Sequence, residues 1–250
     1  MLEFLRRLHA KDIELTDRYL GRTPFHPSYW VNVRIARSIS ENASSAHGII
    51  LDVGCGLKPY RKNFERHVDA YIGMEYSLES GYRGNSADFC GDATLLPVAD
   101  ASIDTILCTE VLEHLANPEK AVSEFARVLR SGGTLITTAP FAFPVHDESD
   151  FFRYAPKGVA ALMSRHGLIV EKVEALSGTA VTLAVLFNVF LFCEMFQWNK
   201  FLYPIGLLAR PLIWILSFII NVVGGLLEFL FYSESLPFDH ITVGVKKSKI

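Results

Sequence analysis

The sequence predicts an α/β fold in which a doubly wound, mostly parallel sheet carries an apolar helical insertion. From Gly48 onward, short apolar runs alternate with helical stretches, which is typical of a parallel sheet with helices on both faces. The apolar runs are continuous, as expected for strands buried on both sides. Residues 178–236 interrupt this alternation with a long and almost uncharged segment before the last expected strand.

The α/β part has clear element boundaries. Asn117 is a good N-cap, Pro118 suits the first helical position, and Gly132-Gly133 suits the stop, so these residues bound a predicted helix. A second helix is expected over residues 156–167. Strands are expected at residues 49–53, 70–75, 103–108, 133–139, 168–176 and 240–245.

The residues before the sheet are expected to form a helical cap. Residues 1–20 have the apolar spacing of an amphipathic helix, which either packs on the main domain or acts as a membrane-surface or lid helix. A turn with two prolines follows at residues 23–27, and residues 29–40 predict another helix. The expected domains are the cap at 1–45, the α/β domain at 46–177 and 237–250, and the insertion at 178–236.

The composition excludes several classes of protein. Hydrophobic residues make up 50% of the chain and charged residues 20%, which excludes intrinsic disorder. A net charge of −3 argues against a nucleic-acid partner, because such a protein needs a clustered basic face. The N-terminus lacks the apolar core of a secretory signal, and the four cysteines form no CxxC pair. A reduced, cytoplasmic setting is therefore expected.

The insertion holds the apolar excess that raises the mean hydropathy of the chain to +0.25. Residues 181–198 contain one charge, Glu194, and residues 211–227 contain none, whereas a membrane span needs about 20 mainly apolar residues. If the flanking strands belong to one sheet, both ends of the insertion lie on the same side of any bilayer. The segment is then a hairpin that dips into the cytoplasmic face of a membrane, lies on it or packs against a partner. The alternative is a soluble helical cap or a dimer interface.

The clearest chemical signal is a buried strand that ends in Gly54-Cys55-Gly56. Glycines there permit backbone conformations and a close approach that a side chain would block. Glu75 ends the next strand, where a carboxylate accepts both ribose hydroxyls of a nucleoside. Asp52 suits a positively charged ligand better than a pyrophosphate. Pro59 stands where the nicotinamide-dinucleotide fingerprint has its third glycine, which disfavours a dehydrogenase.

Together with four further blocks, this turn resembles the class I S-adenosylmethionine-dependent methyltransferases, a family that includes quinone and small-molecule methyltransferases. The resemblance covers roughly residues 48–176, with every block in the expected order and spacing. It departs from the family at Lys58, where many members have a third glycine. The matching blocks are Leu51–Gly56, Glu75, Gly91–Ala93 with Leu96–Val98, Thr109–Leu115 and Leu129–Leu135.

The resemblance implies a Rossmann-like, seven-stranded sheet with an antiparallel last strand, and S-adenosylmethionine as cofactor. With the apolar insertion, it implies methyl transfer to a small or lipid-linked acceptor, at oxygen by default, by in-line displacement from the sulfonium. The alternative is a catalytically silent binding or scaffold protein of the same fold at a membrane. The residues implied to bind the cofactor are Asp52, Gly54, Cys55, Gly56, Glu75, Tyr76, Asp92, Ala93 and Thr109.

A hydroxyl acceptor needs a base, and the sequence offers two candidates. One is His146, in a loop after an expected strand, and the other is Glu110. Glu110, Glu113 and His114 share one helical face if the turn there is helical, which makes them weak metal candidates. No metal is expected, because a structural role for His114 fits this family motif better.

The loop after the strand at 133–139 is the expected acceptor site, because α/β folds place their sites beyond the carboxyl ends of parallel strands. Asp150, Arg153 and Tyr154 are expected to line the acceptor pocket there. In the alternative interpretation, ion pairs within the loop hold it closed and contact no acceptor.

Overall fold

The computed structural model describes residues 19–76, 86–145, 148–192 and 203–247. These residues form two compact units. The α/β unit contains residues 36–176 and those from 239 onward, and the helical unit contains residues up to 35 together with 177–238. Most of the amphipathic helix that was predicted over residues 1–20 lies outside the described residues.

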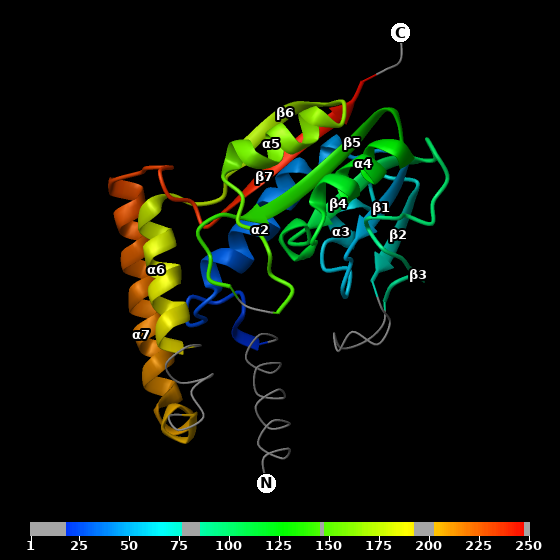
Figure 1. Ribbon diagram of the computed structural model, residues 1–250. Coiled ribbons are helices and arrows are strands. Elements are labelled where there is room, and N and C mark those ends of the chain that lie inside the picture. The colour runs from blue at the N-terminus through cyan, green and yellow to red at the C-terminus, as the bar shows by residue number, and fades with distance from the viewer. Residues whose placement is uncertain (1–18, 77–85, 146–147, 193–202, 248–250) are drawn as a thin grey trace. The chain divides into compact units, whose positions relative to one another are not determined.

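A mixed sheet forms the centre of the α/β unit (Figure 1). Over the described residues its strands are β1 (Ile49–Val53), β2 (Ala70–Glu75), β3 (Phe89–Cys90), β4 (Ile103–Thr109), β5 (Leu129–Pro140), β6 (Leu168–Ala175) and β7 (Asp239–Lys246). Their order is β3-β2-β1-β4-β5-β7-β6. Strands β1 to β5 pair in parallel, and β7 is antiparallel to both β5 and β6. The predicted seven-stranded sheet with an antiparallel last strand is therefore confirmed.

Helices connect the strands, and apolar side chains fill the space between the sheet and the helices that pack on it. The helical elements are α2 (Tyr29–Asn42), η1 (Ala43–Ser45), α3 (Arg61–Phe64), η2 (Leu112–His114), α4 (Pro118–Val128) and α5 (Pro156–Arg165). Leu51 of β1, Ile106 of β4 and Leu135 of β5 are buried together with Val122 and Phe125 of α4. Each such side chain contributes about 1.5–3 kcal/mol of stability through burial.

The direction of the strand order reverses between β1 and β4. The chain builds outward from β1 to β2 and β3, and then crosses to the other side for β4 and β5. Open α/β sheets bind their ligands beyond the carboxyl ends of the strands at such a reversal. The fold therefore predicts a ligand site at the turns that follow β1 and β4.

The predicted end of the helix after Asn117 is wrong. Helix α4 ends at Val128, and Leu129 is already extended (ψ 138°) and pairs with Ile103 of β4. Gly132 (φ 80°) lies instead in the irregular start of β5, where the pairing with β4 is interrupted by a bulge. The glycine signal at this position marks a bend in a strand and not the end of a helix.

The helical unit contains α6 (Thr179–Val189) and α7 (Tyr203–Leu230), which pack side by side (Figure 1). The described residues of the insertion are mainly helical. Within α7, residues 209–230 are long and apolar enough to cross a membrane, and only 28% of the apolar 18-residue window within this stretch is buried.

Replacing Asn117 by Ala is expected to lower the free energy of unfolding by about 1 kcal/mol. The reason is that the Asn117 Oδ1 accepts the Lys120 backbone N–H at 3.1 Å, and this donor would lose its partner at the start of α4. Urea unfolding followed by circular dichroism measures the change. Asn117→Ser keeps a capping oxygen and should lose less than half as much; an equal loss in both variants would contradict the capping role.

Candidate functional site

The turn after β1 requires glycine at two positions. Gly54 (φ 70°) and Gly56 (φ 49°) adopt left-handed backbone conformations that residues with a Cβ seldom take. A Cβ on Gly54 would lie 2.4 Å from Cγ2 of Val111, so the turn after β4 packs directly on the turn after β1. Among the described residues, a Cβ on Gly56 would meet no atom within 4 Å. One side of the turn is therefore closed by protein and the other is open.

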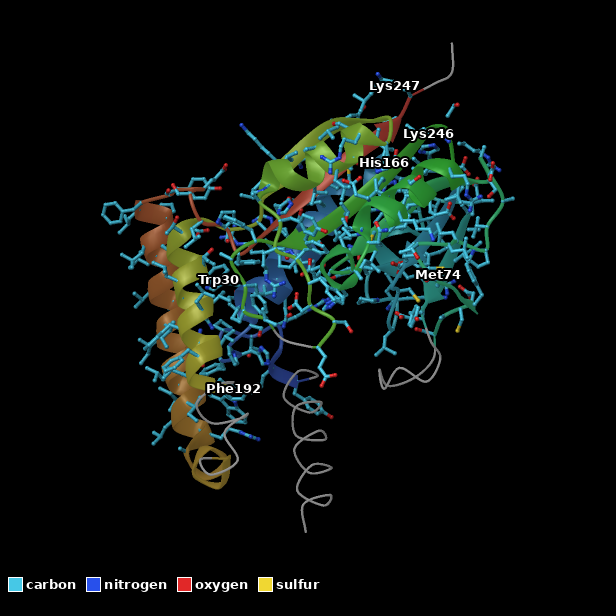
Figure 2. All side chains as sticks on the ribbon, in the orientation of Figure 1. Trp30, Met74, His166, Phe192, Lys246 and Lys247 are labelled. Atoms are coloured by element: carbon cyan, nitrogen blue, oxygen red, sulfur yellow. The ribbon has the colours of Figure 1, made fainter. Side chains whose placement is uncertain are left out.

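Hydrogen bonds tie this turn to the end of β2. The N–H groups of Gly54 and Cys55 donate to the carbonyl oxygen of Met74, at 2.9 and 3.1 Å. The Gly56 N–H donates to Oε1 of Glu75 at 2.5 Å. Within the described part of the chain, the other oxygen of Glu75 accepts no hydrogen bond. A carboxylate oxygen with unused acceptor capacity thus lies next to the turn. Met74 is labelled in Figure 2.

Asp52 is buried at the end of β1 and lacks a full set of partners. Its Oδ2 accepts the hydroxyl of Tyr71 at 2.5 Å, whereas its Oδ1 has no hydrogen-bond partner among the described residues. Burial raises the pKa of Asp52 to about 7, and the Tyr71 hydrogen bond offsets part of this rise. A buried carboxylate without a cation is costly, so this position favours a positively charged ligand.

Lys58, where the family resemblance leads us to expect a third glycine, adopts a backbone conformation that favours glycine. Its φ is 52°, a left-handed value that costs about 1–2 kcal/mol for a residue with a Cβ. Its ammonium group lies 2.6 Å from Oδ2 of Asp88, which also accepts the Gly73 N–H at 2.7 Å. Sequence reasoning missed this pair, although a lysine in place of glycine with an acid in the following loop was a usable signal.

The loop after β3 meets the same edge of the sheet. The Gly91 N–H donates to the carbonyl oxygen of Glu75 at 2.9 Å, which places the following residue, Asp92, near the end of β2. Oδ1 of Asp92 accepts both the N–H and the hydroxyl of Thr94, at 2.7 and 2.8 Å. Ala93 is buried beside it.

Three further predicted cofactor residues lie at the ends of the central strands. Cys55 is buried in the turn, and burial raises the pKa of its thiol to about 12. Tyr76 follows β2 directly and is 78% exposed, and Thr109 is the last residue of β4. The structure thus brings the predicted cofactor residues to one edge of the sheet. Their contact with a cofactor stays a prediction.

Glu110 follows β4 in a left-handed conformation (φ 52°), a strained state that is common at functional sites. It accepts the hydroxyl of Thr138 at 2.6 Å. It is also hydrogen-bonded to the buried carboxyl of Asp239 at the start of β7. Burial, followed by the nearby charge of Glu110, holds the pKa of Asp239 well above its usual range. Asp239 is a site residue that sequence reasoning missed, because its strand is remote in the chain.

The condition for a shared helical face at the metal candidates, a helical turn that includes Glu110, is not met. The turn is a short 3₁₀ helix over residues 112–114, and Glu110 lies outside it in a left-handed conformation. Among the described residues, no three or more His, Cys, Asp or Glu side chains are grouped to hold a metal ion. Glu113 is fully buried, and its pKa is raised to about 9 by burial first and then by Glu110.

Arg153 and Asp150 form an ion pair within the predicted acceptor loop. The Nε of Arg153 also donates to the carbonyl oxygen of Phe143 at 2.7 Å. Tyr154 is half-buried beside this loop, and burial raises the pKa of its hydroxyl. These contacts agree with the interpretation of a loop held by its own ion pairs, whereas contact with an acceptor stays a prediction. His146 lies outside the described residues.

A comparison with family models gives one match, to the methyltransferase domain family, over residues 51–137. The matched region contains the glycine turn, Glu75, Asp92 and the Glu110 turn, which are the elements that meet at the sheet edge. With the strand order, this match identifies a methyltransferase domain within the chain. The chain contains a class I S-adenosylmethionine-dependent methyltransferase domain, whose cofactor is S-adenosylmethionine.

Two curated relatives are O-methyltransferases by name. The O-methyltransferase rstn1 of Aspergillus nomiae is 35% identical over 145 residues, which cover 48% of this chain and 64% of the relative. The ubiquinone biosynthesis O-methyltransferase of Xanthomonas euvesicatoria is 30% identical over 156 residues, which cover 54% and 63%. Other relatives are matched over 36–39% of their length, so the chain spans less than two thirds of all of these proteins.

Solved structures share the fold at low identity. Phosphoethanolamine N-methyltransferase 2 of Haemonchus contortus, solved with S-adenosyl-L-methionine, superposes with a TM-score of 0.53 at 14% identity. The match covers 94% of this chain and 60% of that protein. At this identity the likeness concerns the fold alone.

The residues at the sheet edge fit S-adenosylmethionine. The ligand carries a cationic sulfur and a ribose, which match a buried carboxylate and an accessible one respectively. Within the part of the chain that the structure describes, Oδ1 of Asp52 is buried without a hydrogen-bond partner, and the turn at Gly56 leaves open space beside Glu75. The fit therefore rests on an unpartnered buried oxygen and on an open side of the glycine turn.

Asp52→Asn is expected to remove most of the pH dependence of cofactor affinity. Because the wild-type carboxyl has a pKa of about 7, affinity for a cation should rise by up to about 30-fold between pH 5.5 and 8, the ratio of the ionised fractions. The folding stability of the cofactor-free protein depends on pH in the opposite direction. The raised pKa of Asp52 stabilises the fold at low pH, and this contribution is lost as the pH rises through 7. Calorimetry across this range measures the binding curve. An equally steep dependence in the variant would contradict the assignment.

Proposed function

We propose that this protein transfers a methyl group from S-adenosylmethionine to an oxygen of a small or lipid-linked acceptor at the cytoplasmic face of a membrane. The observation that carries the proposal is the glycine turn with its two carboxylates. Glu75 presents an acceptor oxygen beside the open side of the turn, and Asp52 is buried with no ion pair among the described residues. The oxygen acceptor is favoured by the names of the two curated relatives.

The cofactor, when bound, supplies an electrophilic methyl group on a positively charged sulfur. The chain contributes mainly position, because in-line displacement requires the acceptor close to the methyl group and aligned with it. We assign Asp52 and the backbone of residues 54–56 to the methionine end, Glu75 to the ribose, and Asp92 with Ala93 to the adenine. These roles are the ones that the family resemblance implies, and the residues lie in the same order along the edge from β1 to β3.

Glu110 is the proposed general base for the acceptor hydroxyl. It stands directly after β4, and the turn it begins packs through Val111 on the glycine turn. The Thr138 hydroxyl and the Asp239 carboxyl hold its side chain in place. A base fixed in this way accepts the proton as the oxygen–carbon bond forms. His146 remains the second candidate for this role.

The membrane part of the proposal rests on the polarity of the helical unit. Asn188 and Asn221 are fully buried and hydrogen-bonded to each other at 3.0 Å. Large apolar side chains are exposed instead. They are Leu183, Phe187, Phe190, Leu212, Ile215, Leu216, Phe218, Ile219, Val222, Val223, Leu226, Leu227, Phe229, Leu230 and Phe231. Polar groups inside and apolar groups outside are typical of helices surrounded by lipid.

The length of the apolar stretch agrees with this environment. The 22 residues of Ala209–Leu230 extend over about 33 Å at 1.5 Å per residue, close to the thickness of a bilayer core. The ends of the insertion join β6 and β7, which pair in one sheet. The proposed arrangement is therefore a hairpin that enters and leaves the membrane on the same side, next to lipid-linked acceptors.

Methyl transfer from labelled S-adenosylmethionine to a hydroxylated quinol in phospholipid vesicles tests the function. Glu110→Gln is expected to lower kcat by about 100-fold or more while leaving cofactor affinity unchanged, because only the proton acceptor is lost. Glu119→Gln, an exposed carboxyl paired with Arg165, is the control and should retain activity. A folded wild-type protein that binds no cofactor would support the silent scaffold instead, and full activity of Glu110→Gln would exclude this base.

Ile219→Glu is expected to weaken flotation with neutral vesicles at least about tenfold, because it removes an apolar side chain from the lipid-facing surface and adds a charge. Ile219 is 50% exposed on α7, and Ile169 is 49% exposed on β6 of the α/β unit. Ile169→Glu is therefore a matched control that should float like the wild type. Equal behaviour of the two variants, or a wild type that stays in the soluble fraction, would contradict membrane contact.

A further inference from the structure

A groove in the helical unit is not used by the proposed methyl transfer. Its volume is about 330 Å³, and it is lined by Arg34, Gly225, Glu228, Phe229 and Tyr232, all of which belong to this unit. Such a volume lies within the range of small-molecule and headgroup sites. The residues that line it combine one cation, Arg34, and one anion, Glu228, with two aromatic side chains.

Two contacts fix the guanidinium of Arg34 in this groove. Its Nη2 donates to Oε1 of Glu228 at 3.0 Å, and its central carbon lies 5.1 Å from the ring centroid of Trp30. Trp30 is in turn held by α7, because its indole N–H donates to the carbonyl oxygen of Asn221 at 3.1 Å (Figure 2). Nε and Nη1 of Arg34 have no hydrogen-bond partner among the described residues, and the side chain is 30% exposed. Two donors of a pre-oriented arginine are therefore available to a ligand.

Glu228 neutralises Arg34 only in part. Its other oxygen, Oε2, accepts the N–H groups of Gly178 and Val181 at 2.8 and 3.1 Å. These donors belong to the start of α6, where the positive end of the helix dipole favours a carboxylate. The charge of Glu228 is thus shared between a helix N-terminus and Arg34. The guanidinium keeps positive charge for an anionic ligand.

The rest of the groove has the composition of a membrane interface. Phe229, in the last turn of α7, is 84% exposed, and Tyr232, just after this helix, is 58% exposed. Aromatic side chains and arginine gather where a hydrophobic segment meets the headgroups. Basic pockets at the cytoplasmic side of membrane helices bind anionic headgroups.

We propose that this groove binds the phosphate of an anionic phospholipid, with Nε and Nη1 of Arg34 as donors and the lipid chains along the apolar face of α7. The inference rests on the membrane contact proposed above and adds a headgroup that sets the depth of the hairpin. A phospholipid fits better than a soluble phosphate compound, because Phe229 and Tyr232 complete the groove and no second cation lines it among the described residues.

The test is flotation of the full chain with vesicles of phosphatidylcholine alone and with phosphatidylglycerol added. Wild-type protein is expected to bind the anionic vesicles about fivefold more tightly, the effect of one basic side chain near an anionic surface. Arg34→Gln should lose this gain and still bind neutral vesicles. Arg37→Gln is the matched control and should keep the gain. It removes the same charge one turn further along α2, where the side chain of Arg37 is 69% exposed.

Arg34→Lys tests the site independently of any misfolding of Arg34→Gln. It keeps the charge next to Glu228 and removes the planar pair of donors, so it should lose at least half of the gain. Equal losses in Arg34→Gln and Arg37→Gln, or a wild type that binds neutral vesicles without any gain, would overturn the headgroup site alone. Displacement by millimolar inorganic phosphate would assign the groove to a soluble ligand. Failure to float with either vesicle would overturn the membrane contact itself.

Discussion

The hydrogen bond from the backbone of Gly56 to the carboxylate of Glu75, at 2.5 Å, is the interaction on which the site depends. It forms because β1 and β2 are parallel neighbours, so that the end of one strand faces the turn that follows the other. The turn takes this shape because Gly54 and Gly56 adopt left-handed conformations. Because Val111 packs on Gly54, the same constraint fixes the turn after β4, where the proposed base stands.

Local sequence patterns predicted correctly those elements whose structure depends mainly on their own residues. The strands at 49–53 and 70–75 have the predicted bounds. A continuous apolar run is typical of a parallel strand, because both faces of such a strand are buried. The signal failed where distant segments decide. Pairing with β4 turns Leu129 into a strand residue, although its apolar spacing continues that of α4. Asp239 reaches Glu110 only because β7 inserts next to β5, which no local pattern around either residue reveals.

The two compact units place their polar groups in opposite ways. In the α/β unit the apolar side chains are inside, and the unpaired oxygen of Asp52 lies at the sheet edge where a charged cofactor is expected. In the helical unit Asn188 and Asn221 are inside, and the apolar side chains of α7 face outward. We infer that the α/β unit is suited to an aqueous environment and a charged nucleoside, and that the helical unit is suited to a lipid environment.

The central claim is that Glu75 holds the ribose of S-adenosylmethionine, and calorimetric titration of Glu75→Gln with this cofactor tests it most directly. A charged acceptor of two hydroxyl hydrogen bonds contributes about 1.5–3 kcal/mol, so the account predicts an affinity about 10- to 100-fold weaker than that of the wild type. Glu65→Gln, which alters an exposed carboxyl paired with Arg61, should bind like the wild type. Unchanged affinity in a folded Glu75→Gln protein would contradict the account.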